Sequence, residues 1–278
     1  MRRLLGYLVI LALIGFAVFW FVTAPKRLPD DATAGLTGDA TRGEQIFWAG
    51  GCASCHSAPE ASGDAQLVLV GGQRFASAFG TFIAPNITPD PEAGIGGWSL
   101  QDLANAMQRG VSPEGQHYYP AFPYTSYAKA ELQDIADLKA FMDTLPADAT
   151  PSQPHEVGFP FNIRRNLGGW KFLFFNTDWV IDGELTEAET RGRYLSEALG
   201  HCGECHTPRN VLGGSVTSRW FAGGPDPSGK GSFPNITPAK LTWTEGDLVQ
   251  YFTTGFTPEF DSVGGHMAFV VENLSKLP

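Results

Sequence analysis

The sequence predicts an all-α fold in which two tandem domains follow an N-terminal transmembrane helix. Three observations support this prediction: a long apolar run at the N-terminus, a set of motifs that occurs twice in the same order, and helix signals within each copy. The chain has 278 residues, of which 43% are hydrophobic. That length and composition are ordinary for a protein that buries a core in two modest domains.

The apolar run extends from Leu4 to Val22. Nineteen residues that rise about 1.5 Å each reach about 28 Å, close to the thickness of a bilayer's hydrocarbon core. The apolar part of a cleaved signal peptide is usually shorter, about 7–15 residues. We therefore expect residues 1–24 to be a retained transmembrane anchor, although Val22-Thr23-Ala24 weakly resembles a cleavage site. Residues 25–36 are expected to form a stalk.

Three sequence features recur at matching positions along the rest of the chain. Thr41-Arg42-Gly43 returns as residues 190–192, and Pro-Asn-Ile-Thr-Pro at 85–89 returns at 234–238. A Trp precedes a Gly by twelve residues in both copies, at Trp98 and Trp243. Self-similarity of this kind predicts one fold used twice. The expected boundaries are a first domain at 37–150, an aromatic-rich linker at 151–183 and a second domain at 184–278.

Helix signals lie at corresponding places in the two copies. A Ser or Thr is followed three residues later by an acidic residue, as in a capping box, at Ser99/Asp102, Thr186/Glu189 and Thr244/Asp247. Gly110 and Gly255 fit the position just past a helix end, where a left-handed residue is favoured. The first copy also predicts a helix at 131–145. The second copy ends before the matching point, so we expect that domain to lack its last helix.

Two C-x-x-C-H runs carry the chemistry, at Cys52–His56 and Cys202–His206. This run is the signature of covalent c-type haem attachment. The two thiols add to the haem vinyl groups, and the following His ligates the iron. The two runs use all four cysteines of the chain. We therefore predict two covalently bound haem c groups, held by Cys52, Cys55, Cys202 and Cys205, with His56 and His206 as iron ligands.

The internal repeat also indicates a second ligand for one of the two irons. Such haem often has Met as its other axial ligand. Met267 lies twelve residues beyond Gly255 and is the predicted ligand of the second iron. Twelve residues beyond Gly110 lies Phe122, which has no lone pair to donate. The first iron therefore has no Met at the expected place.

The other Met and His residues have less specific explanations. Met107 and Met142 lie on apolar helix faces and are expected in the core. His117 could reach the first iron, but a His at such a place more often bonds a haem propionate or faces solvent. We expect His201 at the surface and assign no ligand role to it or to His266.

Taken together, these features resemble the membrane-associated cytochrome c subunits of bacterial alcohol and aldehyde dehydrogenases. The resemblance covers residues 37–278, and Phe-Pro-Phe-Asn-Ile-Arg at 159–164 is its most specific mark. It implies two class I cytochrome c domains in tandem that carry electrons away from a periplasmic catalytic subunit. Two departures are Phe122, where the family has Met, and the presence of two haem motifs, where the family usually has a third haem domain.

Charge and cofactor together suggest partners and location. A net charge of −10 with no basic patch argues against a nucleic-acid partner. Thioether formation belongs to the periplasm, and Arg2-Arg3 favours a cytoplasmic N-terminus. We therefore expect a single-pass protein of the bacterial inner membrane with its haem domains in the periplasm. Its partners would be a redox donor, such as a dehydrogenase or a quinol-oxidising complex, and a terminal acceptor.

Two alternatives to a pure electron relay stay open. An unligated face on the first iron would suit a dihaem oxidoreductase or a cytochrome that binds small ligands. The sequence has no obvious distal acid–base pair beyond His117, which favours electron transfer over catalysis. Alternatively, the linker at Phe159–Phe175 could make this chain a docking subunit that holds a dehydrogenase at the membrane.

Overall fold

The computed structural model describes all residues, 1–278. Its helices are α1 (Arg2–Val22), α2 (Ala40–Ala49), α3 (Cys52–His56), α4 (Leu100–Arg109), α5 (Tyr124–Tyr127), α6 (Leu132–Met142), α7 (Asn166–Phe174), α8 (Glu187–Arg193), α9 (Gly203–His206), α10 (Glu245–Thr254) and α11 (His266–Leu274). Short 3₁₀ segments are η1 (Gly63–Leu67) and η3 (Thr217–Arg219), and η2 (Tyr194–Leu199) is π-helical. The strands are β1 (Arg74–Ser77), β2 (Gly80–Ile83), β3 (Gly224–Pro225) and β4 (Ser232–Phe233).

The strands correct the prediction of an all-α fold. They form two separate antiparallel hairpins, β1–β2 and β3–β4. Each hairpin follows a haem motif and precedes a Pro-Asn-Ile-Thr segment, so the two pairs occupy the same place in the two repeats. Strands of two to four residues are too short to produce the alternating pattern that reveals a strand in a sequence.

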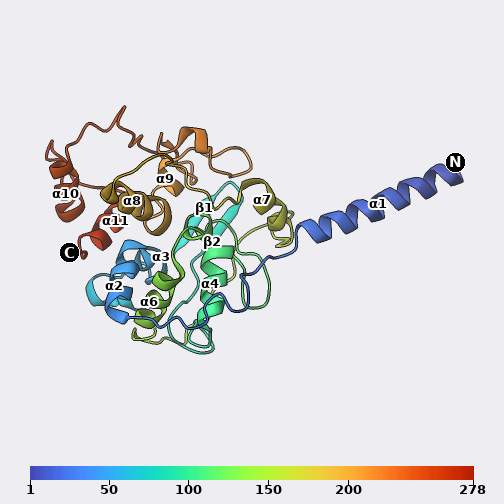
Figure 1. The fold of residues 1–278 in the computed structure, drawn as a ribbon, viewed down its shortest axis with the longest axis horizontal. Helices are drawn as coiled ribbons and strands as arrows, with labels where there is room; N and C mark the ends of the chain where they lie inside the picture. Colours follow the sequence, from blue (N-terminus) through green and yellow to red (C-terminus); the bar gives the residue numbers. More distant parts are fainter.

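Helix α1 projects away from the rest of the molecule, as Figure 1 shows, and none of its residues is buried. It is the one helix of the chain that is long and apolar enough to cross a membrane, judged by length and composition. The segment after it is packed rather than free. Thr23 is 2% exposed and Leu28 is 8% exposed. The backbone amide of Leu28 donates to Asn105 Oδ1 at 2.8 Å, which fastens the expected stalk to the first repeat.

Within the first repeat, α2 and α6 pack together closely because Gly43 has no side chain. A Cβ at Gly43 would overlap the backbone carbonyl of Asp137 on α6. The predicted core positions Met107 and Met142 are both buried, at 5% and 4% exposure. Helix α6 begins and ends within the expected range of 131–145.

The predicted helix ends are confirmed in detail. Ser99, Thr186 and Thr244 each form a capping box with the acidic residue three positions on. Gly110 and Gly255 follow α4 and α10 in the left-handed conformation, with φ of 58° and 77°. These signals were readable in the sequence because each depends on residues within one turn of the helix.

The two repeats share one hydrophobic core. Side chains of α2 (Ile46, Phe47, Trp48) and of η2 (Tyr194, Ala198, Leu199) belong to the same buried cluster. Helix α11 packs against α2 and α3, which belong to the first repeat. Figure 1 shows α11 beside α2 and α3. The C-terminal helix of the second repeat therefore lies next to the first repeat.

Candidate haem-attachment sites

The first C-x-x-C-H run forms the short helix α3, which begins after Gly51 in the left-handed conformation. Nδ1 of His56 donates to the backbone carbonyl of Pro85 at 2.9 Å. Because Nδ1 is used in this way, Nε2 is the ring nitrogen that carries a free lone pair. Burial lowers the pKa of His56, against the opposing effect of the Pro85 carbonyl. The imidazole is thus held neutral with Nε2 available to a metal.

The second run repeats this arrangement. Nδ1 of His206 donates to the backbone carbonyl of Pro234 at 2.8 Å, and His206 is 5% exposed. Its own backbone carbonyl accepts from Gly223 N at 2.7 Å, as that of His56 accepts from Gly71 N at 2.7 Å. The two sites therefore match in side-chain and backbone bonding.

The prolyl carbonyls are functional groups that the sequence analysis missed. Each Pro-Asn-Ile-Thr segment forms a turn, in which Thr88 N donates to Asn86 Oδ1 at 2.8 Å and Thr237 N donates to Asn235 Oδ1 at 2.9 Å. The turn fixes the preceding carbonyl beside the His ring. A hydrogen bond from the ring nitrogen that does not bind the metal sets the tautomer and orientation of a ligating His. Repetition of the motif was the signal that could have revealed this role.

The cysteines fit haem attachment and not a disulfide framework. All four are free thiols. Burial is the main cause that raises the pKa of Cys52 to about 12 and the pKa of Cys55 to about 11. Burial likewise raises the pKa values of Cys202 and Cys205 to about 11. Two neutral thiols beside an imidazole with a free Nε2 are the donor set that covalent haem requires.

Met267 lies in the first turn of α11 and is half-buried. The ring of Phe233 lies between those of His206 and His266, with centroids 6.2 Å and 6.3 Å away. His266 directly precedes Met267, so Phe233 contacts both His206 and the start of α11. The pairing of Met267 with His206 across one iron stays a prediction.

Phe122 is part of the aromatic packing of the first repeat. Its ring lies 5.8 Å from the rings of Tyr118 and Tyr127, and it packs against the common core. The structure gives this residue a packing role where the second repeat has Met267.

His117 is buried, which excludes the solvent-facing position that the sequence allowed. It is 3% exposed, and its Nε2 donates to the backbone carbonyl of Thr23 at 2.9 Å. Burial is the largest cause that lowers the pKa of His117, and Lys171 and Arg165 lower it further. The Nδ1 of His117 is buried without a hydrogen-bond partner, and its role toward the first haem stays a prediction. Through Nε2, His117 fastens the end of α1 to the first repeat. The sequence could not reveal this because the partner is 94 residues away.

The two attachment runs lie back to back. Tyr127 Oη donates to the carbonyl of Gly50, two residues before Cys52, at 3.0 Å. The Tyr127 ring lies 5.6 Å from the ring of His201, which precedes Cys202. A Cβ at Gly200 would stand 3.7 Å from the carbonyl oxygen of Ala49. His201 is thus half-buried at this junction and not at the surface as expected, and burial lowers its pKa.

Glu204, inside the second run, adds a polar link between the repeats. Its Oε1 accepts from Thr125 Oγ1 at 2.6 Å and from Ser126 Oγ at 3.0 Å, and Arg209 pairs with its Oε2. Burial by itself would raise the pKa of Glu204, but Arg209 and Thr125 lower it overall. The second haem-attachment helix is therefore tied to α5 of the first repeat.

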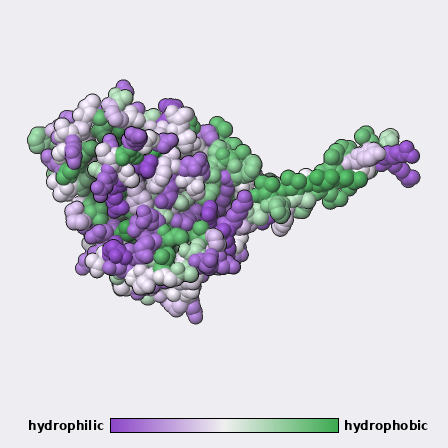
Figure 2. Space-filling model, viewed as in Figure 1, coloured by the Kyte–Doolittle hydropathy of each residue, from purple (hydrophilic) through white to green (hydrophobic).

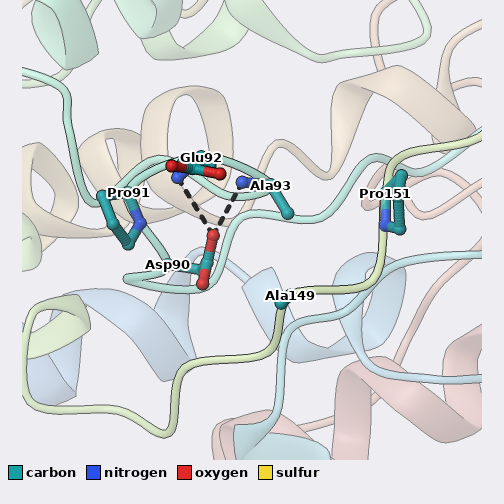
Figure 3. Close-up of a pocket in the computed structure, with 6 residues that line it drawn as sticks. All are labelled: Asp90, Pro91, Glu92, Ala93, Ala149 and Pro151. Carbon is teal, nitrogen blue, oxygen red and sulfur yellow. Dashed lines mark hydrogen bonds between the residues drawn. The ribbon is translucent and has the colours of Figure 1, made fainter.

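The pocket in Figure 3 lies apart from this chemistry. Its lining residues are Asp90, Pro91, Glu92, Ala93, Ala149 and Pro151. Asp90 Oδ1 accepts from the backbone amides of Glu92 at 3.0 Å and Ala93 at 2.7 Å. The carboxylate is thus used to shape its own turn, and the lining includes no Cys, His or Met.

Comparisons with known proteins agree with the geometry. The family model described as cytochrome c matches residues 40–146. A protein of Cereibacter sphaeroides named "Diheme cytochrome c-type" is 59% identical over 278 residues, which cover all of this chain and 94% of the relative. The fructose dehydrogenase cytochrome subunit of Gluconobacter japonicus is 36% identical over 246 residues, 86% of this chain and 49% of the relative.

The cytochrome c subunit of a quinone-dependent alcohol dehydrogenase from Gluconobacter oxydans is 32% identical over 273 residues, 94% of this chain and 54% of the relative. This chain therefore spans about half the length of the dehydrogenase subunits that it matches. The resemblance noted from the motifs is confirmed by these relatives. The chain belongs to the cytochrome c family of haem electron-transfer proteins and is homologous to the cytochrome subunits of alcohol and fructose dehydrogenases.

Proposed function

We propose that this protein is a membrane-anchored dihaem cytochrome c that relays single electrons in the periplasm. One haem would be attached through Cys52 and Cys55 and the other through Cys202 and Cys205, with His56 and His206 as proximal ligands. Bound haem supplies the reversible one-electron couple. The chain supplies the ligands, their orientation and the separation of the two groups.

The observation that carries this proposal is the back-to-back placement of the two attachment runs. Residues directly before Cys52 and Cys202 contact one another through Tyr127, His201 and Gly200. Haem thioethers are fixed to these cysteines, so the attached edges of the two groups would face a common junction. Electron-transfer rates fall steeply with distance, and such a junction favours rapid exchange between the two sites.

The ligands of the two irons would differ. We assign His206 and Met267 to the second iron, because a thioether opposite His favours reduced iron and raises its potential. The first iron would have His56 as the ligand on one face. Phe122, which cannot donate a lone pair, would stand on the other face. The Pro85 and Pro234 carbonyls would keep both proximal rings in the same tautomer.

We infer that α1 is retained as an anchor. Thr23, at the weak cleavage sequence, is 2% exposed, and its carbonyl and hydroxyl bond His117 and Arg165. Residues of a cleaved signal would not be expected to form part of the packed fold. Retention would place α1 in the bacterial inner membrane, with both haem domains in the periplasm where thioethers are made.

The partners follow from the named relatives. The relatives include cytochrome subunits of fructose, alcohol and gluconate dehydrogenases. We propose that the donor is a periplasmic dehydrogenase or a quinol-oxidising complex and that a terminal acceptor receives the electrons. The net charge of −10 would suit a partner with a basic docking face.

An optical redox titration of the purified, haem-loaded chain tests the relay. Two reversible one-electron couples, removed one at a time by His56→Ala and His206→Ala, would support it. An intact protein with no reversible one-electron couple would rule it out. Asp64→Ala is a suitable control, because this carboxylate lies in η1 and bonds neither site.

One observation favours a second candidate function, a haem with an open coordination face that binds a small ligand. That observation is Phe122, which replaces a possible ligand in the first repeat. Carbon monoxide added to the reduced protein distinguishes the two. A Soret shift in about half the haem would indicate an open first site, whereas no shift would indicate six ligands on both irons. The Nε2 of His117 is bonded to Thr23, which leaves only the buried Nδ1, without a hydrogen-bond partner, for a role at that site.

A further inference from the structure

We propose that residues 159–173 form a lipid-binding surface beside the membrane anchor. The surface consists of five exposed apolar side chains, named here the juxtamembrane patch: Phe159, Phe161, Ile163, Phe172 and Leu173. Its occupant is the interface of the bilayer from which α1 emerges. This inference rests on the proposed function, because it needs α1 to lie in a membrane.

Helix α7 packs directly on the last turn of α1. A Cβ at Gly168 would overlap the backbone carbonyl of Thr23, so the two chains touch at this point. Arg165 Nε donates to Thr23 Oγ1 at 2.9 Å. The Arg165 guanidinium also lies 4.2 Å from the centre of the Trp20 ring and donates to the Trp20 carbonyl. Arg165 is therefore at the level of the last turn of α1, where the helix would leave the hydrocarbon.

The two faces of α7 have different surroundings. Phe172 and Leu173 follow Gly168 and Gly169 by four residues, so all four share one face of the helix. The glycines on this face meet the end of α1, while Phe172 and Leu173 are 72% and 62% exposed. Helical spacing thus places two large apolar side chains beside the anchor with no protein covering them.

The opposite face of α7 holds the helix to the protein body. Lys171 Nζ donates to the carbonyls of Arg109 and Gly110 at 2.5 Å and 2.8 Å, which caps the end of α4. The ring centres of Trp170 and Phe174 lie 5.4 Å apart, and those of Trp170 and Tyr124 lie 6.5 Å apart. These contacts fix the rotation of α7 and therefore the direction in which its exposed face points.

The turn before α7 is oriented in the same way. Phe159 is 81% exposed, and Phe161 and Ile163 are about half exposed, at 47% and 42%. Arg164 points inward instead, with its Nη1 donating to the His117 carbonyl at 3.1 Å and its guanidinium 4.1 Å above the Tyr119 ring. Apolar side chains are thus turned outward while the neighbouring cation bonds the body.

Continuity with α1 identifies the occupant as lipid. Figure 2 shows hydrophobic surface continuing from α1 onto the body of the molecule where the helix joins it. If α1 crosses the bilayer, Thr23 is at the membrane surface, and whatever packs on Thr23 lies in the headgroup region. Phe and Leu are typical of the apolar face of helices that lie at that depth, and such a face gains free energy by entering the acyl boundary.

The test is lipid cross-linking of the full-length, haem-loaded protein in nanodiscs that contain a phospholipid with a photoreactive acyl chain. Mass spectrometry then maps the labelled residues. We expect label in α1 and in residues 159–173, with none at Val211, Val249 or Phe260. These three control residues are 93%, 61% and 85% exposed but lie in the second repeat.

The possible outcomes separate this proposal from the anchor itself. Label in α1 without label in 159–173 would overturn the lipid surface, leave the anchor intact, and assign the patch to a protein partner. Absence of label from both would refute the anchor. The double variant Phe172→Ser, Leu173→Ser should lose most cross-links at 159–173 and keep those in α1 and the haem spectrum. Val249→Ser, Phe260→Ser is the matched control and should change none of them.

Discussion

A single backbone carbonyl orients the imidazole of each His that we propose as a haem ligand. The Pro85 and Pro234 carbonyls lie 2.9 Å and 2.8 Å from the Nδ1 atoms of His56 and His206. These contacts explain why the Pro-Asn-Ile-Thr segments occur twice at matching places. The sequence predicted the ligands but not the groups that orient them, because a backbone carbonyl leaves no trace in residue identity.

Met267 and Phe122 would distinguish the two irons at the scale of one residue. Replacing Met267 by Ala should leave the second iron with one axial ligand. In the reduced protein, the fraction of haem that binds carbon monoxide should then increase by about one half. The reduction potential of the higher-potential couple should decrease. Met107→Leu is the control, because Met107 is a buried core residue at 5% exposure. Unchanged carbon monoxide binding in Met267→Ala would contradict the assignment.

A buried carboxylate gives a pH prediction. Asp137 is 1% exposed and accepts from Arg42 Nε at 2.7 Å and from Asp39 N at 2.8 Å. The hydrogen bond from Arg42 is the largest cause that lowers the pKa of Asp137. A lowered folded-state pKa stabilises the protein above the unfolded value of about 4, and this contribution is lost as pH falls through the folded value.

Urea unfolding of the holoprotein at several pH values checks this prediction. Asp137→Asn should lower the free energy of unfolding at pH 7 by about 1.5–3 kcal/mol. The variant should differ less from the parent below about pH 4. Asp143→Asn should have little effect, since Asp143 pairs with Lys139 at the surface. A loss in Asp137→Asn that does not shrink on acidification would disprove the linkage.

Among the elements, the two copies of Thr-Arg-Gly have different environments. Gly43 lets α2 approach α6, because a Cβ there would overlap the Asp137 carbonyl. Gly192 in α8 has nothing within 4 Å of its Cβ position. The same three residues thus support a close helix contact in the first repeat and an open face in the second.

This difference predicts opposite effects of the same substitution. Gly43→Ala should destabilise the protein by about 1–3 kcal/mol through overpacking. Gly192→Ala should be neutral or stabilise it by up to about 1 kcal/mol, because Ala has the higher helix propensity. Thermal unfolding of both variants provides the comparison, and each variant serves as the other's control. Equal losses in both would contradict the described packing of α2 on α6.

Local signals explain which elements were predictable. The capping boxes at Ser99, Thr186 and Thr244 and the left-handed glycines at Gly110 and Gly255 are complete within a few residues. The hairpins β1–β2 and β3–β4 were missed because their strands are very short. The bond from His117 to Thr23 and the contact of Tyr127 with His201 join distant parts of the chain, and no local pattern encodes them.

In the whole molecule, the repeats form one core in place of two separate ones. Leu199 on η2 is 1% exposed and belongs to the cluster that contains Phe47 of α2. Tyr194 Oη donates to Asp134 on α6 at 2.5 Å and accepts from Glu131 N at 3.0 Å. Contacts of this kind would hold the proposed haem sites in a fixed relative position.

Shared packing predicts joint unfolding. Leu199→Ala should cost about 2–5 kcal/mol, as for other large-to-small core changes. The loss of stability should affect both repeats. Haem absorbance and circular dichroism should therefore report one unfolding transition with the same lowered midpoint. Leu212→Ala is the control, since Leu212 is 54% exposed. Two separate transitions, with one unaffected by Leu199→Ala, would show that the repeats are independent.

The central proposal is a two-haem relay across one fixed junction, and an EPR-monitored redox titration of the full-length holoprotein tests it most directly. We predict two ferric signals that disappear in two reversible one-electron steps. The signal that remains should also change shape when the neighbouring iron becomes diamagnetic on reduction. A single signal, or two signals that titrate without influencing each other, would contradict the placement of the two haems at the Tyr127–His201 junction.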